Sequence, residues 1–147
     1  MTDASVATLM TRFPDVLLDH DNHRYYAGLL TQQLLLNRCE ACAWWHAEPL
    51  RSMCPACWSS DVRATPVTGR GVIHLLTRLH QGPAVEGVSY DPPLLLAAIE
   101  LDEQPGLRVV GTVLPAADAP VEIGQRVELV WPSNLVAPRL AFRAVAP

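Results

Sequence analysis

All four cysteines of the sequence lie in one stretch, RCEACAWWHAEPLRSMCPACW, as two C-x-x-C pairs: Cys39 with Cys42, and Cys54 with Cys57. Eleven residues separate the pairs. In a C-x-x-C turn the two sulfurs converge on one point, and a second pair completes a tetrahedron of thiolates around Zn²⁺. The spacing therefore predicts a structural zinc site with four protein ligands and no open coordination position.

Two other uses of such cysteines stay open at this point. Four thiolates also bind iron, and C-x-x-C pairs serve thiol–disulfide exchange. The N-terminus carries an acidic residue, Asp3, and lacks a basic start followed by an apolar core, so it does not read as a signal peptide. No apolar run approaches the ~20 residues of a membrane helix. We therefore expect a cytoplasmic protein, and in a reducing compartment cysteine pairs more often bind metal than form disulfides.

The residues around the cysteines are rich in tryptophan. Trp44, Trp45 and Trp58 most simply cover a core that is too thin to fold without its metal. His46 is interpreted as a surface or packing residue, because four thiolates already satisfy zinc.

Composition and charge limit the classes of function. Half of the 147 residues are apolar and 18% are charged, which is typical of a folded soluble protein of one domain, or of a small domain with an appended module. The net charge is −4, and the eleven basic residues are all arginine, scattered singly. A nucleic-acid-binding protein usually shows a basic patch, so this charge pattern argues against non-specific binding to DNA or RNA.

The elements that must position the cysteines begin with a helix over NHRYYAGLLTQ, capped by Asp19 or Asp21. Its apolar stripe, at helical spacing, packs on its own domain or docks on a partner; the stripe comprises Tyr25, Tyr26, Leu29 and Leu30. LLLNRC then reads as a strand that leads into the metal site.

From Val62 onward the pattern is of short strands broken by Gly and Pro. Gly69 and Gly71 suggest a bend or bulge at the start of a strand whose faces alternate. One face would carry Ile73, Leu75, Thr77 and Leu79, and the other His74, Leu76, Arg78 and His80. A hairpin is predicted across Asp102 to Gly106, and two further strands follow. Five strands favour a small closed barrel over a sandwich, which usually needs about seven.

The motifs together, in this order, resemble a known bacterial and archaeal family. The resemblance covers the chain from about Asp21 to the C-terminus, and its motifs are Tyr25-Tyr26-Ala27-Gly28-Leu29, Arg38-Cys39-x-x-Cys42, Pro49 to Cys54-Pro55-x-Cys57, and Gly69-Arg70-Gly71 opening a strand that ends at His80. Members join a rubredoxin-like zinc ribbon to an OB-fold and were long catalogued as a domain of unknown function.

The resemblance implies a mainly β fold in three segments: an N-terminal helical segment (1–37), a rubredoxin-like zinc ribbon with four cysteine ligands (38–61) and a five-stranded OB-fold barrel (62–147). The sequence departs from the pattern where a Gly commonly follows the second Cys of each turn, at a position that tends towards positive φ. Ala43 and Trp58 stand there, at a cost of ~1 kcal/mol each that zinc binding can absorb.

In function, the resemblance implies an accessory subunit of a heteromeric complex with a thiolase-superfamily protein, expected as a heterotetramer. The partner would make or break a carbon–carbon bond of an acyl-CoA as a thiolase, a steroid retro-aldolase or a β-ketoacyl-CoA enzyme of lipid or aromatic degradation. The small subunit braces the partner, and contacts with the partner or its substrate channel are expected at Trp44, Trp45, Arg51, Tyr25, Tyr26 and His80. Thiolase chemistry needs a nucleophilic cysteine, and all four here are committed to metal, so no catalytic residue is expected in this chain.

The alternative is a single-stranded nucleic-acid-binding OB-fold protein with a zinc ribbon. Such proteins need aromatic stacking platforms and basic grooves, and the predicted barrel has only Tyr90, Trp131 and Phe142 as aromatics. Trp131, at a strand end, is expected in the barrel core. A free-standing CoA-binding protein is a third class, but the sequence lacks a Gly-rich phosphate loop.

Overall fold

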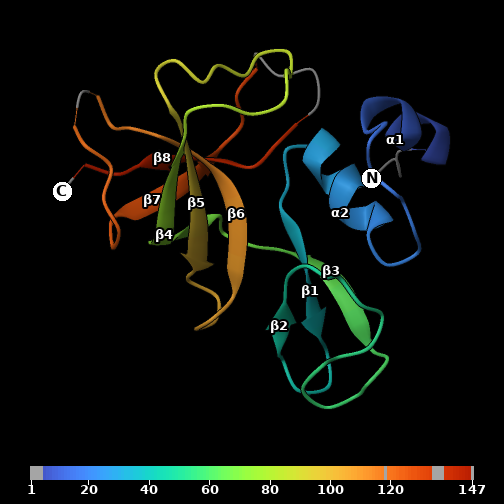
Figure 1. Ribbon diagram of the computed structural model, residues 1–147. Coiled ribbons are helices and arrows are strands. Elements are labelled where there is room, and N and C mark those ends of the chain that lie inside the picture. The colour runs from blue at the N-terminus through green and yellow to red at the C-terminus, as the bar shows by residue number, and fades with distance from the viewer. Residues whose placement is uncertain (1–4, 118, 134–137, 147) are drawn as a thin grey trace. The chain divides into compact units, whose positions relative to one another are not determined.

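The computed structural model describes residues 5–117, 119–133 and 138–146 (Figure 1). These residues form two compact units, 1–67 and 68–147, each with its own sheet. The units are a coarser division than the three segments expected from the sequence, so that finer division stays a prediction. Among the described residues, no helix is long and apolar enough to cross a membrane.

Two short helices open the first unit. Helix α1 spans Val6–Arg12, with Ser5 as its N-cap, and α2 spans His23–Leu30. The prediction of Asp19 or Asp21 as the cap of α2 is wrong, because the N-cap is Asn22. Asp19 instead accepts hydrogen bonds from the backbone amides of Asp21 and Asn22, and so fixes the turn that leads into the helix.

The apolar stripe predicted for α2 is found largely buried. Tyr25 and Leu29 are buried, while Tyr26 and Leu30 are half-buried. Phe13, which follows α1, packs against Tyr26 with ring centroids 4.9 Å apart. Gly28 is required where α2 approaches the next strand, because a Cβ there would lie 2.7 Å from the carbonyl oxygen of Gln33 and 2.9 Å from Cγ of Leu35.

A three-stranded antiparallel sheet completes the first unit. Strand β1 (Leu35–Cys39), predicted from LLLNRC, lies in its centre between β2 (Trp45–His46) and β3 (Val62–Pro66) (Figure 1). Strand β3 pairs with β1 along its whole length, from Leu35 opposite Pro66 to Cys39 opposite Val62. The sheet therefore brings the end of the second cysteine turn back beside the first.

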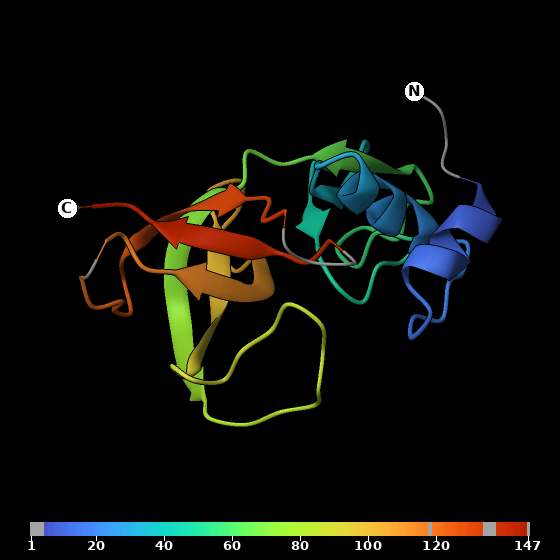
Figure 2. The ribbon, with the colours of Figure 1, turned by 90° about the horizontal axis from the view of Figure 1, so that it is seen from above.

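The second unit is the closed five-stranded barrel that the turn pattern predicts. Its strands are β4 (Arg70–Leu79), β5 (Leu94–Leu101), β6 (Arg108–Leu114), β7 (Arg126–Val130) and β8 (Ala141–Ala144), in the order β4-β5-β6-β8-β7. Figure 2 shows β8 between β6 and β7. The β6–β8 pair is parallel and the other pairs are antiparallel. The predicted hairpin across Asp102 to Gly106 joins β5 to β6.

The barrel core is aliphatic and centred on Phe142. This ring is fully buried, and so are Ile73, Ile99 and Val127. Gly111 leaves the space for the ring, because a Cβ at this position would lie 2.9 Å from Cε2 of Phe142. Trp131 follows β7 and is half-buried, so it contributes less to the core than expected.

The prediction for the two faces of β4 is wrong beyond Ile73. A β-bulge falls between Ile73, which pairs with Ile99, and Leu75, which pairs with Ala98. The extra residue, His74, shifts the alternation by one position, because two residues of β4 then face one of β5. Ile73 therefore points into the barrel, whereas Leu75 is 58% exposed. The register shift of β4 thus lies inside the strand, while Gly69, directly before β4, has a φ of +75°, which fits the bend predicted at the start of the strand.

Candidate metal centre

The four cysteine sulfurs converge as the spacing predicts. The sulfur atoms of Cys39 and Cys57 are 3.6 Å apart, as are those of Cys42 and Cys54, and all four lie within 4.8 Å of one another. A disulfide would need about 2.05 Å. Four thiolates bound to one ion at about 2.3 Å form a tetrahedron with edges of about 3.8 Å. The sulfur positions therefore fit a tetrahedral metal site.

The two cysteine turns share one backbone arrangement. In the first, the amide of Cys39 donates to the carbonyl of Trp44, and the amide of Ala43 donates to the carbonyl of Cys39. In the second, the amide of Cys54 donates to the carbonyl of Ser59, and the amide of Trp58 donates to the carbonyl of Cys54. The first cysteine of each turn is buried and the second is exposed. Each turn thus presents its two sulfurs in the same way.

The residue after each second cysteine adopts the left-handed conformation expected there. Both Ala43 and Trp58 have φ of +64°. A residue with a Cβ is strained at this φ, so both turns keep a conformation that glycine would adopt freely. The indole of Trp58 is 74% exposed.

The sulfurs lie close enough to alter one another's protonation. Burial raises the pKa of Cys54, but amide donors at Cys57 and Ala56 and the neighbouring thiols outweigh it and lower this pKa to about 7. The amide of Trp44 lowers the pKa of Cys42, but desolvation and the three other thiols raise it to about 12. The pKa values of Cys54 and Cys42 thus move in opposite directions, because the two sulfurs lie close together. A divalent ion supplies the charge that lets several thiolates coexist.

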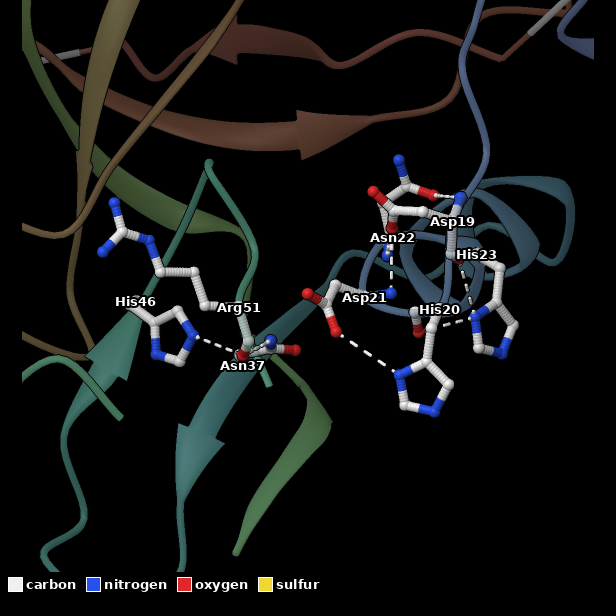
Figure 3. A network of polar contacts seen from close by, with 8 residues as sticks. All are labelled: Asp19, His20, Asp21, Asn22, His23, Asn37, His46 and Arg51. Atoms are coloured by element: carbon white, nitrogen blue, oxygen red, sulfur yellow. Dashed lines mark hydrogen bonds and ion pairs between the residues drawn. The ribbon is translucent and has the colours of Figure 1, made fainter. Parts of the chain in front are cut away.

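A polar network holds the loop between the two turns (Figure 3). The carbonyl oxygen of Arg51 accepts hydrogen bonds from Nδ2 of Asn37, at 3.0 Å, and from Nε2 of His46, at 3.2 Å. Asn37 lies on β1 and His46 on β2, and both side chains are buried. His46 is thus a packing residue, one of the two roles expected for it, and it fixes the loop that carries the chain to Cys54.

The same loop is tied to the turn before α2. The hydroxyl and amide of Ser52 hydrogen-bond the carboxylate of Asp21, and His20 adds a contact of 3.3 Å; together they lower the pKa of Asp21. Nδ1 of His23 lies 2.9 Å from the carbonyl oxygen of His20, so this nitrogen carries the proton. These residues line a shallow polar depression with Arg24 and Arg51.

The residues expected to contact a partner are dispersed over the structure. Trp44 is 44% exposed beside the first cysteine turn, and Arg51 is exposed on the loop. Trp45 is half-buried, with the guanidinium of Arg38 5.8 Å from its ring centroid. Tyr26 is half-buried and Tyr25 buried, and burial raises the pKa of both phenols. His80 is exposed just after β4. Contact with a partner stays a prediction for all of them.

The expectation that three tryptophans cover the core around the metal is wrong for Trp44 and Trp58, which are exposed. With Met53, also exposed, they surround the cysteine turns with apolar surface. Sequence reasoning missed Trp58 and Met53 as candidate contact residues.

Comparisons with known proteins agree with this architecture. Residues 64–132 match the family model of the ChsH2 C-terminal OB-fold domain. A solved structure described as "Ltp2-ChsH2(DUF35) aldolase" is similar at a TM-score of 0.74 and 26% identity, over 89% of this chain and 99% of that chain. A DUF35-family protein of unknown function from Sulfolobus solfataricus has the same fold, with a TM-score of 0.60 and 15% identity over 95% of this chain and 96% of that one. No curated protein matches.

Proposed function

We propose that the protein is a non-catalytic accessory subunit of a heteromeric aldolase or thiolase-type complex, because its closed barrel matches the family model of the ChsH2 C-terminal OB-fold domain over residues 64–132. The observation that carries the proposal is the likeness to the chain from the Ltp2-ChsH2(DUF35) aldolase, which extends over both units and 99% of that chain. A match to the barrel alone would leave the function of the first unit open.

The chemistry of the chain supports an accessory role. The sequence has four cysteines, and all four lie in the candidate metal centre. A thiolase-like reaction needs a cysteine nucleophile, so that nucleophile belongs to the partner. We propose that the partner is a thiolase-superfamily protein acting on an acyl-CoA in lipid, steroid or aromatic degradation, and that the two form a cytoplasmic heterotetramer.

The metal that best suits the centre is Zn²⁺. Four thiolates with tetrahedral spacing and no open position are typical of structural zinc sites. Cys39, Cys42, Cys54 and Cys57 would hold the ion, and it would supply structural stability rather than catalysis. Elemental analysis of protein purified without added metal tests this assignment; folded protein that contains neither zinc nor iron would refute it.

The surface around the cysteine turns is proposed to contact the partner. Trp44 and Arg51 are exposed there, as predicted for an interface segment. The exposed side chains of Trp58 and Met53 add apolar area to the same surface. Exposed aromatic and arginine side chains are the types most enriched in the energetic centres of protein interfaces.

Co-expression with the thiolase-like protein encoded beside this chain tests the function. We expect the two to co-purify, and the partner to be insoluble or inactive on acyl-CoA when expressed alone. A Cys39→Ser substitution should remove the metal and abolish co-purification. A partner that is soluble and fully active without this chain would refute the accessory role. Salt-sensitive binding of single-stranded DNA or RNA would instead favour the nucleic-acid alternative.

A further inference from the structure

The outer face of the first three barrel strands carries a group of uncharged residues, some exposed and some half-buried. In register across the sheet, Leu75 pairs with Ala98, which pairs with Val110, and the next outward row joins Thr77, Leu96 and Thr112. Beyond them lie Leu79, paired with Leu94, and Leu114, two residues after Thr112 on β6. We call this the outer patch: Leu75, Thr77, Leu79, Leu94, Leu96, Ala98, Val110, Thr112 and Leu114.

The outer patch depends on the bulge at His74. Without the extra residue, strict alternation would turn Leu75 and Leu79 into the barrel and Leu76 and Arg78 outward. With the extra residue, the side chains of Leu75, Thr77 and Leu79 lie on the outer face of β4. Val110 is 61% exposed and Leu75 58%.

Charged residues border the outer patch but do not enter it. Glu100 and Arg108 form an ion pair of 3.1 Å in the row next to Leu75, Ala98 and Val110. Arg143 of β8 pairs with Leu114 at the opposite end. An apolar centre with a charged rim is the composition of a protein–protein interface.

The side chains of the outer patch indicate which kind of ligand it can bind. In OB-folds that bind oligonucleotides or oligosaccharides, the face of the second and third strands carries the ligand. Those strands here are β5 and β6, and their outward residues in the outer patch are aliphatic or threonine, with no aromatic ring and no arginine. Bases need stacking platforms and phosphates need cations. A face of this chemistry suits the apolar surface of another protein.

The size of the outer patch argues for a partner other than a second copy. Three strands about 4.8 Å apart and three rows about 6.8 Å apart cover about 300 Å². Two copies meeting through this patch would bury about 600 Å² in total, whereas stable interfaces bury about 1,200–2,000 Å². A larger partner can reach that range by extending over the charged rim.

We infer that the outer patch is a docking surface for an apolar face of the thiolase-like partner. This inference rests on the proposed function and adds to it a second contact surface, on the barrel, separate from the cysteine turns. The aliphatic rows form the centre of that interface, and Glu100, Arg108 and Arg143 form its polar rim.

Single lysine substitutions in the outer patch test the inference. Val110→Lys and Leu75→Lys place a charge on an exposed position, so the barrel should stay folded, which thermal unfolding by circular dichroism checks. Ile123→Lys is the matched control, because Ile123 is 62% exposed in the same unit and lies outside the patch. Each variant is co-expressed with the wild-type chain and the affinity-tagged thiolase-like protein, and the ratio of variant to wild-type chain in the purified complex, measured by mass spectrometry, gives the relative affinity.

We expect both patch variants to weaken binding at least about tenfold and Ile123→Lys to bind as the wild type does. Wild-type affinity in both patch variants would overturn the inference and leave the proposed function intact. A wild-type chain that does not bind the thiolase-like protein would overturn the proposed function itself. A wild-type chain that is dimeric alone in light scattering, and that Val110→Lys makes monomeric, would assign the patch to a second copy and also overturn the inference.

Discussion

Removal of the proposed zinc ion at pH 7 should unfold the first unit, residues 1–67, and leave the barrel, residues 68–147, folded. The regular structure around the cysteines consists of strands of five, two and five residues, joined by two turns that the sulfurs hold together. A core of fewer than about 70–80 residues rarely supplies more than about 3–5 kcal/mol. A structural zinc ion contributes about 10–16 kcal/mol at neutral pH. The free energy that the bound ion contributes is larger than the free energy that this core contributes, so the core cannot keep the unit folded once the ion is lost.

Hydrogen exchange with a chelator present measures this directly. Amides that close the two turns, those of Cys39, Ala43, Cys54 and Trp58, should lose protection, while amides of β5 and β6 keep it. Tryptophan fluorescence gives a second signal, because three of the four tryptophans lie before residue 68. Protection that persists in residues 35–66, after elemental analysis shows that the metal is gone, would refute this account of the first unit.

Two further predictions concern single residues. Replacing Ala43 by Gly should raise the free energy of unfolding of the metal-bound protein by about 0.5–1 kcal/mol, because glycine adopts a positive φ without strain. Chemical denaturation measures the change. A lower free energy of unfolding in the variant would contradict the strain argument. Arg126 hydrogen-bonds Asp102 at 2.6 and 2.7 Å and thereby lowers the pKa of that carboxyl. Because this pKa is lowered, the ion pair stabilises the folded protein at pH values above the ordinary pKa of an aspartate. The stabilisation is lost as the pH falls through the pKa that Asp102 has in the folded protein. Asp102→Asn should therefore lower the melting temperature at pH 7 by more than it does near pH 2. An equal effect at both pH values would exclude the ion pair as its cause.

Local signals in the sequence account for much of the architecture. The cysteine spacing predicted the metal centre, since two C-x-x-C turns have few other uses in a ribbon. Glycine and proline marked the strand ends of the barrel, and the hairpin at Asp102 to Gly106 formed where a turn was predicted. These features depend on residues close together in the chain, and sequence patterns report such features well.

The features that escaped prediction depend on contacts between distant residues. The bulge at His74 arises from how β4 pairs with β5. The sequence of β4 alone does not show which of its residues face the interior of the barrel and which face outward. The parallel pairing of β6 with β8 joins strands that are about 30 residues apart and has no local signal. Exposure of Trp44 and Trp58 likewise follows from the folded turns, because the hydrophobicity of tryptophan by itself favours burial.

The connection between the units has a consequence for affinity. Only residues 67–69 separate β3 from β4, so a partner that binds one unit raises the effective concentration of the other unit around itself. Short links of this kind give effective concentrations in the millimolar range, and joint binding then exceeds the affinity of either part by about 10²–10⁴. The surface at the cysteine turns and the outer patch can each bind weakly and still act together as one tight, bivalent ligand.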